Sequence, residues 1–206
     1  MTAPSTQAKG SAPEALYQRA AGGDSEAFWE LVRPHERLIH AVAFGILRDS
    51  ELAQDVVHDT YVRAFGTLGS LRSPARMTSW LYGMGRNIAH ETLRKRQRAD
   101  RLVNEPPPQP EVLIVSDLLI KEEELAALDR ATRELPEQHR IVLGLRYMQG
   151  MSCKEIAAAL DIGLEAAKSR LFEARKALHR RLTAAEKTAA PSPASSVRGV
   201  QPASGQ

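Results

Sequence analysis

The sequence predicts an all-α fold made of two helical domains that are joined by a proline-rich flexible linker. Apolar residues recur at intervals of three and four in both halves of the chain, which is the spacing of a helix face, and no segment alternates as a strand would. Four of the five residues from 106 to 110 are prolines, which fix φ and remove backbone donors, so an extended spacer is expected there. The 206 residues are enough for two domains that each bury a core.

These features divide the chain into five segments. Residues 1–12 are rich in Ser, Thr, Ala, Pro and Gly and are expected to form a disordered lead, and residues 184–206 a disordered tail of similar composition. Between them we expect the first domain at 13–103, the linker at 104–122 and the second domain at 123–183.

In the first domain, an apolar stripe predicts a helix from about residue 24 to residue 47, with Asp24 and Ser25 at its N-cap. The stripe consists of Phe28, Leu31, Val32, His35, Leu38, Ile39, Val42, Ile46 and Leu47. A second helix is predicted at about 51–67, before a glycine-containing stretch. A third is predicted to begin near Ser73 and Pro74, because proline is tolerated in the first turn of a helix.

The second domain is predicted to contain four helices. The first carries the stripe Leu125, Leu128, Ala131 and Leu135 and ends at Pro136, and the second covers about 137–148. The third begins at Ser152, which forms a capping box pattern with Glu155. A short turn at 160–163 separates it from a last helix whose apolar face is Leu164, Ala167, Leu171, Ala174, Leu178 and Leu182. These last two helices predict a helix-turn-helix, whose second helix enters the major groove of DNA.

Charge is segregated along the chain. Residues 24–60 hold eight acids and three arginines, whereas residues 72–101 hold eight basic side chains and two acids. Residues 164–183 hold six basic side chains and two acids. A basic helix on each domain indicates two separate contacts with nucleic acid. The alternative is that these are solvated helix faces, or charges that suit the helix dipole.

Three motifs resemble one family, the extracytoplasmic-function sigma factors. The segment AQDVVHDTYVRAF from Ala53 to Phe65 resembles region 2.2 of that family, and WLYGMGRNIAHETLRKRQR from Trp80 to Arg98 resembles regions 2.3 and 2.4. The segment from Leu135 to Leu182 resembles region 4. The resemblance implies a sigma factor that binds core RNA polymerase, directs it to promoters by −10 and −35 recognition, and promotes strand opening, in response to an environmental or envelope signal.

The resemblance also implies a role for each matched residue of the first domain. The region 2.2 helix would bind the polymerase clamp helices through Asp55, His58 and Asp59, and the two acids are four apart on one helix face. The −10 element would be contacted by Leu71, Trp80, Asn87, Arg94, Lys95, Arg96 and Arg98. Asn87 stands at the family's pocket asparagine, whose amide can read a base edge. Leu71 replaces the family's pocket aromatic, and Trp80 is expected to be a core residue more than a base-stacking one.

In the second domain, the −35 contacts of the family fall on Lys168, Ser169 and Phe172, with Arg175 placed for a phosphate. The implied partners are core RNA polymerase, through the clamp helices and the flap of its large subunits, promoter DNA and an anti-sigma factor. No cofactor is expected.

Nothing in the sequence indicates an enzyme or a metal site. Cys153 is the only cysteine, and His35 and His40 are five apart, not the four that a zinc-binding HExxH helix requires. The N-terminal lead has no apolar core and no run approaches eighteen apolar residues, so neither a signal peptide nor membrane insertion is expected. A reducing cytoplasm is the expected compartment.

Two other functions would also use parts of this sequence. A repressor or activator could use the same helix-turn-helix without polymerase, and would then carry a ligand or receiver domain in its first half. A non-DNA adaptor that binds an anti-sigma factor would have lost the basic residues, which are present here. Gly83 and Gly85 fall in the middle of a predicted helix, where each costs about 1 kcal/mol of helix propensity. They would permit either close packing or a bend.

Overall fold

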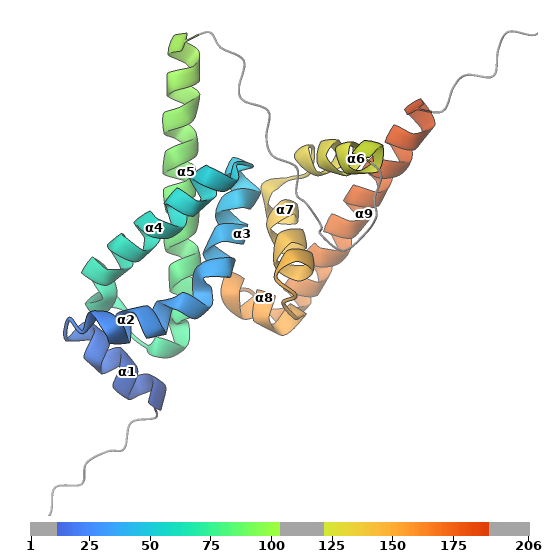
Figure 1. Ribbon diagram of the computed structural model, residues 1–206. Coiled ribbons are helices and arrows are strands. Elements are labelled where there is room, and N and C mark those ends of the chain that lie inside the picture. Colours follow the sequence, from blue (N-terminus) through green and yellow to red (C-terminus); the bar gives the residue numbers. More distant parts are fainter. Residues whose placement is uncertain (1–11, 104–121, 190–206) are drawn as a thin grey trace, which may run out of the picture.

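A computed structural model describes residues 12–103 and 122–189 of the chain (Figure 1). The first domain contains α1 (Ala12–Ala21), α2 (Ser25–Val32), α3 (Glu36–Leu47), α4 (Ser50–Thr67) and α5 (Met77–Val103). The second contains α6 (Glu122–Arg133), α7 (Glu137–Leu143), α8 (Cys153–Leu160) and α9 (Leu164–Ala189). Within the described ranges all regular structure is helical, which confirms the predicted fold class. The expected lead and linker lie almost entirely outside these ranges, as do residues 190–206 of the expected tail.

The helix predicted from 24 to 47 is two helices, so that prediction is wrong in one respect. Asp24 caps α2 as expected, and its side chain accepts a hydrogen bond from the Ala27 N–H at 3.0 Å. A 3-10 turn at Arg33–His35 then separates α2 from α3. Pro34 explains the break, because proline has no N–H and its ring clashes with the carbonyl four residues back. Because the apolar stripe continues across the turn, the spacing of apolar residues alone does not reveal this helix break.

The last helix is longer than predicted. α9 ends at Ala189, so residues 184–189, which were assigned to a disordered tail, are helical. This stretch is rich in Ala, Glu and Lys, which have high helix propensity and so favour extension of the helix. At the other end of the same domain, α7 passes into a π-type turn at Gly144–Met148 where a regular helix was predicted.

The capping box predicted at the start of α8 is confirmed. The Ser152 side chain accepts from the Glu155 N–H at 3.3 Å, and the Glu155 carboxylate accepts from the Ser152 N–H at 2.7 Å. These bonds lower the pKa of Glu155, because they stabilise its charged form. The box fixes where α8, the first helix of the helix-turn-helix, begins.

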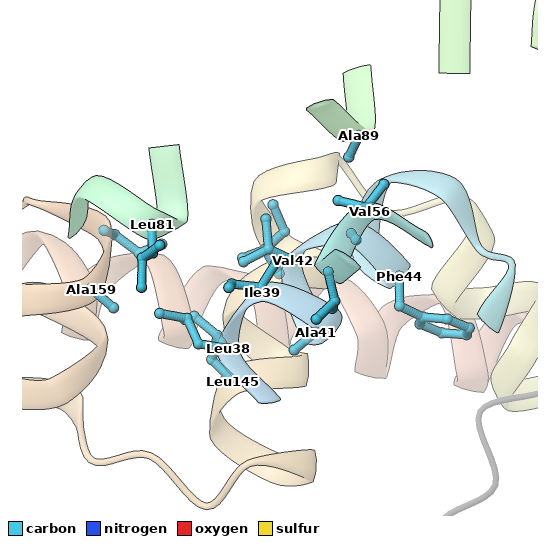
Figure 2. Packing of buried hydrophobic residues seen from close by; sticks show 14 of the residues in the cluster. Leu38, Ile39, Ala41, Val42, Phe44, Val56, Leu81, Ala89, Leu145 and Ala159 are labelled. Carbon is cyan, nitrogen blue, oxygen red and sulfur yellow. The ribbon is translucent and has the colours of Figure 1, made fainter. Parts of the chain in front are cut away.

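Helix α3 is the centre of the molecule. Nine of its twelve residues are buried, because α4 and α5 cover it on the first-domain side and α7 packs on it from the second domain. Figure 2 shows Ile39 and Val42 of α3 among side chains of α4 and α5, and Leu38 close to Leu145 of the second domain. A helix that is apolar on all sides is stable only when it is surrounded in this way.

The two glycines of α5 have different roles. A Cβ at Gly85 would lie 2.9 Å from Cγ2 of Ile39, which is fully buried, whereas a Cβ at Gly83 would meet nothing within 4 Å. Gly85 therefore permits the close approach of α5 to α3, which is the packing alternative raised by the sequence. Gly83 has no such packing role.

These environments predict opposite effects of one substitution. Gly83→Ala should raise the free energy of unfolding by up to about 1 kcal/mol, because alanine is the better helix former. Gly85→Ala should lower it by about 1–3 kcal/mol, because the added methyl overpacks the α3–α5 contact. Urea unfolding followed by circular dichroism measures both variants, and each serves as the control for the other. Equal stability of the two would contradict the described contact.

The two domains pack against each other, which the sequence did not predict. Helix α7 and the turn after it contact α3, and α8 contacts α5. Their buried side chains form one cluster, in which Ala159 of α8 lies near Leu81 of α5 (Figure 2). The arrangement brings the helix-turn-helix against the first domain.

Candidate functional site

The residues predicted to bind polymerase lie together on the exposed face of α4. Asp49 caps this helix by accepting from the Leu52 N–H at 3.1 Å. The apolar side of α4 packs on α3 and α5, and this fixes the opposite side toward solvent. Asp55, His58 and Asp59 are all exposed on that side.

Exposed apolar side chains that the sequence analysis missed lie beside these residues. Trp29 of α2 is 51% exposed, and Val62 and Phe65 of α4 are 62% and 46% exposed. Together with His58 they line a depression of about 260 Å³. Phe65 contacts Phe28 edge to face at 5.0 Å, and Trp29 contacts Tyr61 in the same way at 5.4 Å.

We call this surface the α2–α4 patch. It consists of Trp29, Asp55, His58, Asp59, Val62 and Phe65. Its apolar centre beside a pair of acids suits a protein partner better than it suits DNA, which acids repel. Val62 and Phe65 could have been found from the sequence, since they continue the helical stripe of Asp55 and His58 at intervals of three and four. Trp29 could not, because its neighbours come from another helix.

A polar pocket lies at the start of α5. It has a volume of about 350 Å³ and is lined by Ser70, Leu71, Arg72, Arg76, Ser79, Trp80 and Asp161. Leu71 is only 6% exposed, and its carbonyl accepts from the Tyr17 hydroxyl at 2.7 Å. Trp80 is half-buried against the core and also borders the pocket. Two of the residues predicted for the −10 element are thus brought together, along with two arginines that were not predicted.

Asn87 is not among the residues that line this pocket. It is exposed on α5, seven residues after Trp80 and therefore on the same helix face. Gly83 lies between them and leaves the surface open. A strand that leaves the pocket along α5 would consequently pass Asn87.

The basic residues that follow are not equivalent. Arg94, Lys95 and Arg98 are exposed on α5. Arg96 instead pairs with the Asp49 carboxylate at 3.1 Å, and its side chain is only 21% exposed. Because Asp49 caps α4, Arg96 links α5 to the start of α4 and is less available to a phosphate than its neighbours.

The predicted −35 residues form an open surface on the N-terminal half of α9. Lys168 and Ser169 are exposed, and Phe172 is 63% exposed. Lys168 pairs with Glu165 at 2.8 Å, and this contact raises the pKa of Lys168. Arg175 lies over the Tyr147 ring, 5.5 Å from its centre. The opposite face, including Ala167 and Leu171, is buried.

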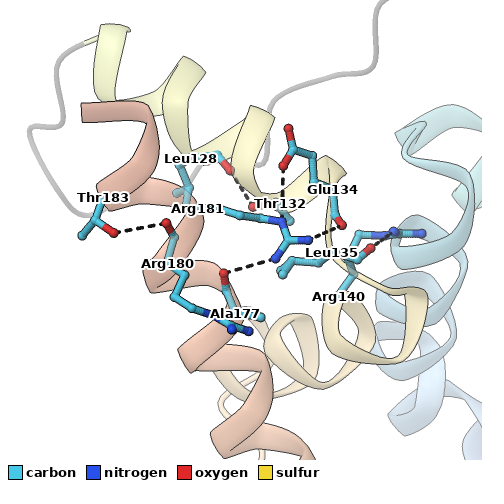
Figure 3. Close-up of polar contacts among 9 residues, drawn as sticks. All are labelled: Leu128, Thr132, Glu134, Leu135, Arg140, Ala177, Arg180, Arg181 and Thr183. Atoms are coloured by element: carbon cyan, nitrogen blue, oxygen red, sulfur yellow. Dashed lines mark hydrogen bonds and ion pairs between the residues drawn. The ribbon is translucent and has the colours of Figure 1, made fainter. Parts of the chain in front are cut away.

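The C-terminal half of α9 has a structural role. Arg181 donates to the Glu134 carbonyl at 3.0 Å and to the Ala177 carbonyl at 3.4 Å (Figure 3). The bond to Glu134 ties α9 to the loop between α6 and α7, whereas the bond to Ala177 lies within α9. Arg181 is therefore a weaker candidate for DNA contact than the exposed Arg180, although both belong to the same basic run.

In residues 12–103 and 122–189 no three His, Cys, Asp or Glu side chains are grouped so as to hold a metal ion. No helix of the described chain has the length and apolar character that crossing a bilayer requires. Burial lowers the pKa of His35, which favours its neutral form in the turn between α2 and α3.

Comparison with known proteins covers both domains. The chain matches the family models for sigma-70 region 2 over residues 31–99 and for sigma-70 region 4 over residues 125–178. It is 32% identical over 160 residues to the ECF RNA polymerase sigma factor SigM of Mycobacterium tuberculosis, covering 78% of this chain and 79% of that protein. It is 27% identical over 177 residues to the RNA polymerase sigma-H factor of Pseudomonas aeruginosa, covering 81% and 92%.

A solved structure agrees with these relatives. The structure of CnrH in complex with the cytosolic domain of CnrY aligns with a TM-score of 0.58 at 29% identity, covering 84% of this chain and 97% of that one. The likeness therefore extends over both helical domains.

Proposed function

Since the chain belongs to the extracytoplasmic-function sigma factors, which initiate transcription and are not enzymes, we propose that it carries core RNA polymerase to specific promoters and promotes strand opening there. The observation behind this proposal is the placement of three exposed surfaces on different elements. They are the α2–α4 patch, the pocket and basic face of α5, and the N-terminal half of α9. Each has the chemistry that one partner of a sigma factor requires.

The α2–α4 patch is proposed to bind the polymerase clamp helices. Exposed aromatic side chains at the centre of a surface are typical of binding hot spots, and the acids beside them supply charge complementarity. Asp55 and Asp59 would pair with basic clamp residues, while Trp29 and Phe65 would fill apolar contacts. The flap would meet the second domain, where Tyr147 and Met148 are 61% and 41% exposed.

The pocket at the start of α5 is proposed to receive a base of the −10 element. Trp80, which borders the pocket, would stack on the base, and Arg72 and Arg76 would offer charge for the adjoining phosphates. Asn87 would read a base edge farther along α5, because an amide both donates and accepts. Arg94, Lys95 and Arg98 would neutralise phosphates, and holding bases out of the stack would promote strand opening.

Asn87→Ala should reduce promoter opening while leaving polymerase binding intact. One lost base contact costs about 1–3 kcal/mol, which corresponds to roughly 5- to 150-fold in the opening equilibrium. Permanganate reactivity of unpaired thymines measures opening, and co-elution with core enzyme measures binding. Gln97→Ala is the matched control, since it removes another exposed amide from α5. Equal losses of opening and of polymerase binding would show that Asn87 is misassigned.

The exposed half of α9 is proposed to read the −35 element in the major groove. Lys168 and Ser169 can donate to base edges or phosphates, and Phe172 can pack on a thymine methyl or a sugar. Arg175 would contact a phosphate. Lys168 would have to exchange its Glu165 partner for DNA on binding.

The regulation and the cellular compartment of this chain are proposed by analogy with its relatives. The CnrH structure contains the cytosolic domain of a second protein, CnrY, which supports an anti-sigma partner for this chain as well. A sigma factor works where RNA polymerase works, so the chain is proposed to act in the cytoplasm, released by an environmental or envelope signal.

The proposal is tested by adding the chain to core polymerase that is free of other sigma factors. Initiation at discrete promoters supports it. Tight binding to duplex DNA without polymerase would instead favour the hypothesis of a repressor or activator.

A further inference from the structure

An acidic side chain lies on the surface of α9 that is proposed to read the −35 element. Glu165 is in the first turn of this helix, and its side chain is 84% exposed. It precedes Lys168, Ser169 and Phe172 by three, four and seven residues, so all four side chains lie on one helix face. The family resemblance gives a DNA contact to the other three residues and none to Glu165.

The turn before α9 fixes the position of Glu165. The Ile162 N–H donates to the Ala157 carbonyl at 3.0 Å, which closes the turn. The Gly163 carbonyl accepts from the N–H of the buried Ala167, also at 3.0 Å. A Cβ at Gly163 would meet nothing within 4 Å, so the surface just ahead of Glu165 is open. Because the N-terminal residues of a recognition helix contact base edges, Glu165 lies at the end of α9 that meets the bases.

A purely structural role does not account for this position. An acid in the first turn interacts favourably with the helix dipole wherever it lies around the helix. The neighbouring position, Ala166, is also exposed and would serve that purpose away from the DNA-reading face. On a surface that approaches phosphates, a carboxylate repels DNA unless a donor on the DNA compensates for it. The location of Glu165 therefore points to such a donor.

Few groups on duplex DNA can donate to a carboxylate in the major groove. They are the N4 amino group of cytosine and the N6 amino group of adenine. Adenine presents the acceptor N7 beside its amino group, and this acceptor repels a carboxylate. Cytosine presents no acceptor of its own in the major groove. Cytosine is consequently the better partner for Glu165.

Lys168 completes the match to a C·G base pair. Its ammonium lies 2.8 Å from the Glu165 carboxylate, so the two side chains present a donor and an acceptor side by side. A C·G pair presents the complementary groups, because guanine O6 accepts and lies next to the cytosine N4 amino group, to which it is hydrogen-bonded. When the ion pair opens on binding, each charge finds a new partner on the same base pair.

We propose that Glu165 determines promoter specificity by accepting a hydrogen bond from the N4 amino group of a cytosine in the −35 element, while Lys168 donates to the paired guanine. The inference rests on the −35 role proposed for α9. It predicts one position of the element at which a C·G pair is required in a fixed orientation. A G·C pair would place the guanine acceptors opposite the carboxylate.

The test uses holoenzyme assembled from the full chain and core polymerase. Its template is the promoter found by run-off transcription, with the −35 element randomised, and the bound duplexes are sequenced. Glu165→Ala should lower the preference for C·G at one position by roughly 5- to 150-fold, the range for one good base contact. Glu165→Gln should move the preference at that position to A·T, because an amide bonds both N6 and N7 of adenine.

Glu173→Ala is the matched control. It removes the same charge from the exposed surface of α9, eight residues or about 12 Å farther along the helix. It should leave the preference for C·G intact.

A modified base separates a direct contact from general electrostatics. N4-methylcytosine still pairs with guanine, but its methyl group replaces the N–H that points into the major groove. At the C·G position it should weaken binding of the parent holoenzyme about fivefold or more, as measured by fluorescence anisotropy. Holoenzyme with Glu165→Ala should bind the methylated and unmethylated duplexes equally.

The outcomes distinguish this inference from the −35 role itself. If Glu165→Ala keeps the parent's base preferences while Lys168→Ala relaxes them, the inference is overturned and the −35 role stands. Equal weakening of parent and Glu165→Ala by the methylated base would also overturn it. If Glu165→Ala, Lys168→Ala and Phe172→Ala all leave the base preferences unchanged, the −35 role of α9 fails, and the inference fails with it.

Discussion

Asp55→Arg combined with Asp59→Arg is expected to abolish binding to core RNA polymerase. Both carboxylates are exposed on one face of α4, so the substitutions leave the core of the first domain untouched. In the proposed complex they would place two positive charges opposite basic clamp residues, and like-charge juxtaposition across an interface costs several kcal/mol. Size-exclusion chromatography of the chain with core enzyme measures the loss.

The matched control is Glu91→Arg combined with Asp100→Arg, which makes the same change in net charge on α5, outside the patch. It should still co-elute with core enzyme. Co-elution of the Asp55 and Asp59 variant would show that the polymerase surface lies elsewhere.

Trp29→Ala is expected to weaken polymerase binding by about 2–4 kcal/mol, or roughly 30- to 1,000-fold, as for a central aromatic hot spot. Half of the Trp29 side chain is exposed. Truncation to alanine therefore removes mainly contact area that is available to a partner, together with the edge-to-face contact with Tyr61. Fluorescence anisotropy titration with labelled chain gives the dissociation constant. Phe172→Ala removes an exposed aromatic from α9 and should leave polymerase binding unchanged. An unaltered dissociation constant for Trp29→Ala would place it outside the interface.

Local features of the fold could be predicted because their causes are local. The capping box at Ser152, the N-cap at Asp24 and the helix-turn-helix around residue 161 all depend on residues within a few positions of one another. The break at Pro34 is also local, but the apolar stripe continues across it and predicts one uninterrupted helix.

Contacts between distant segments could not be predicted from one sequence. Periodicity shows that α3 has an apolar face but not that a second domain covers part of it. Gly45 and Gly85 become interpretable only when Ile141 and Ile39 are seen beside them. Asp161 resembles an ordinary turn residue until the turn is placed at the pocket of the other domain.

The candidate site was predicted in part. The exposed residues of α4 and α9 lie on surfaces as the resemblance implied, and their function stays a prediction. Leu71 and Trp80 border one pocket, whereas Asn87 lies outside it and Arg96 is held by Asp49. The position of a residue in a motif indicates which helix carries it. Only the packing of that helix decides whether the side chain remains available to a partner.

Run-off transcription tests the central claim most directly. The purified chain is mixed with sigma-free core polymerase on sheared genomic DNA from the source, and the 5′ ends of the transcripts are sequenced. The account predicts discrete start sites that share two upstream elements, near −10 and −35. Absence of initiation, together with polymerase-independent binding to duplex DNA, would contradict it.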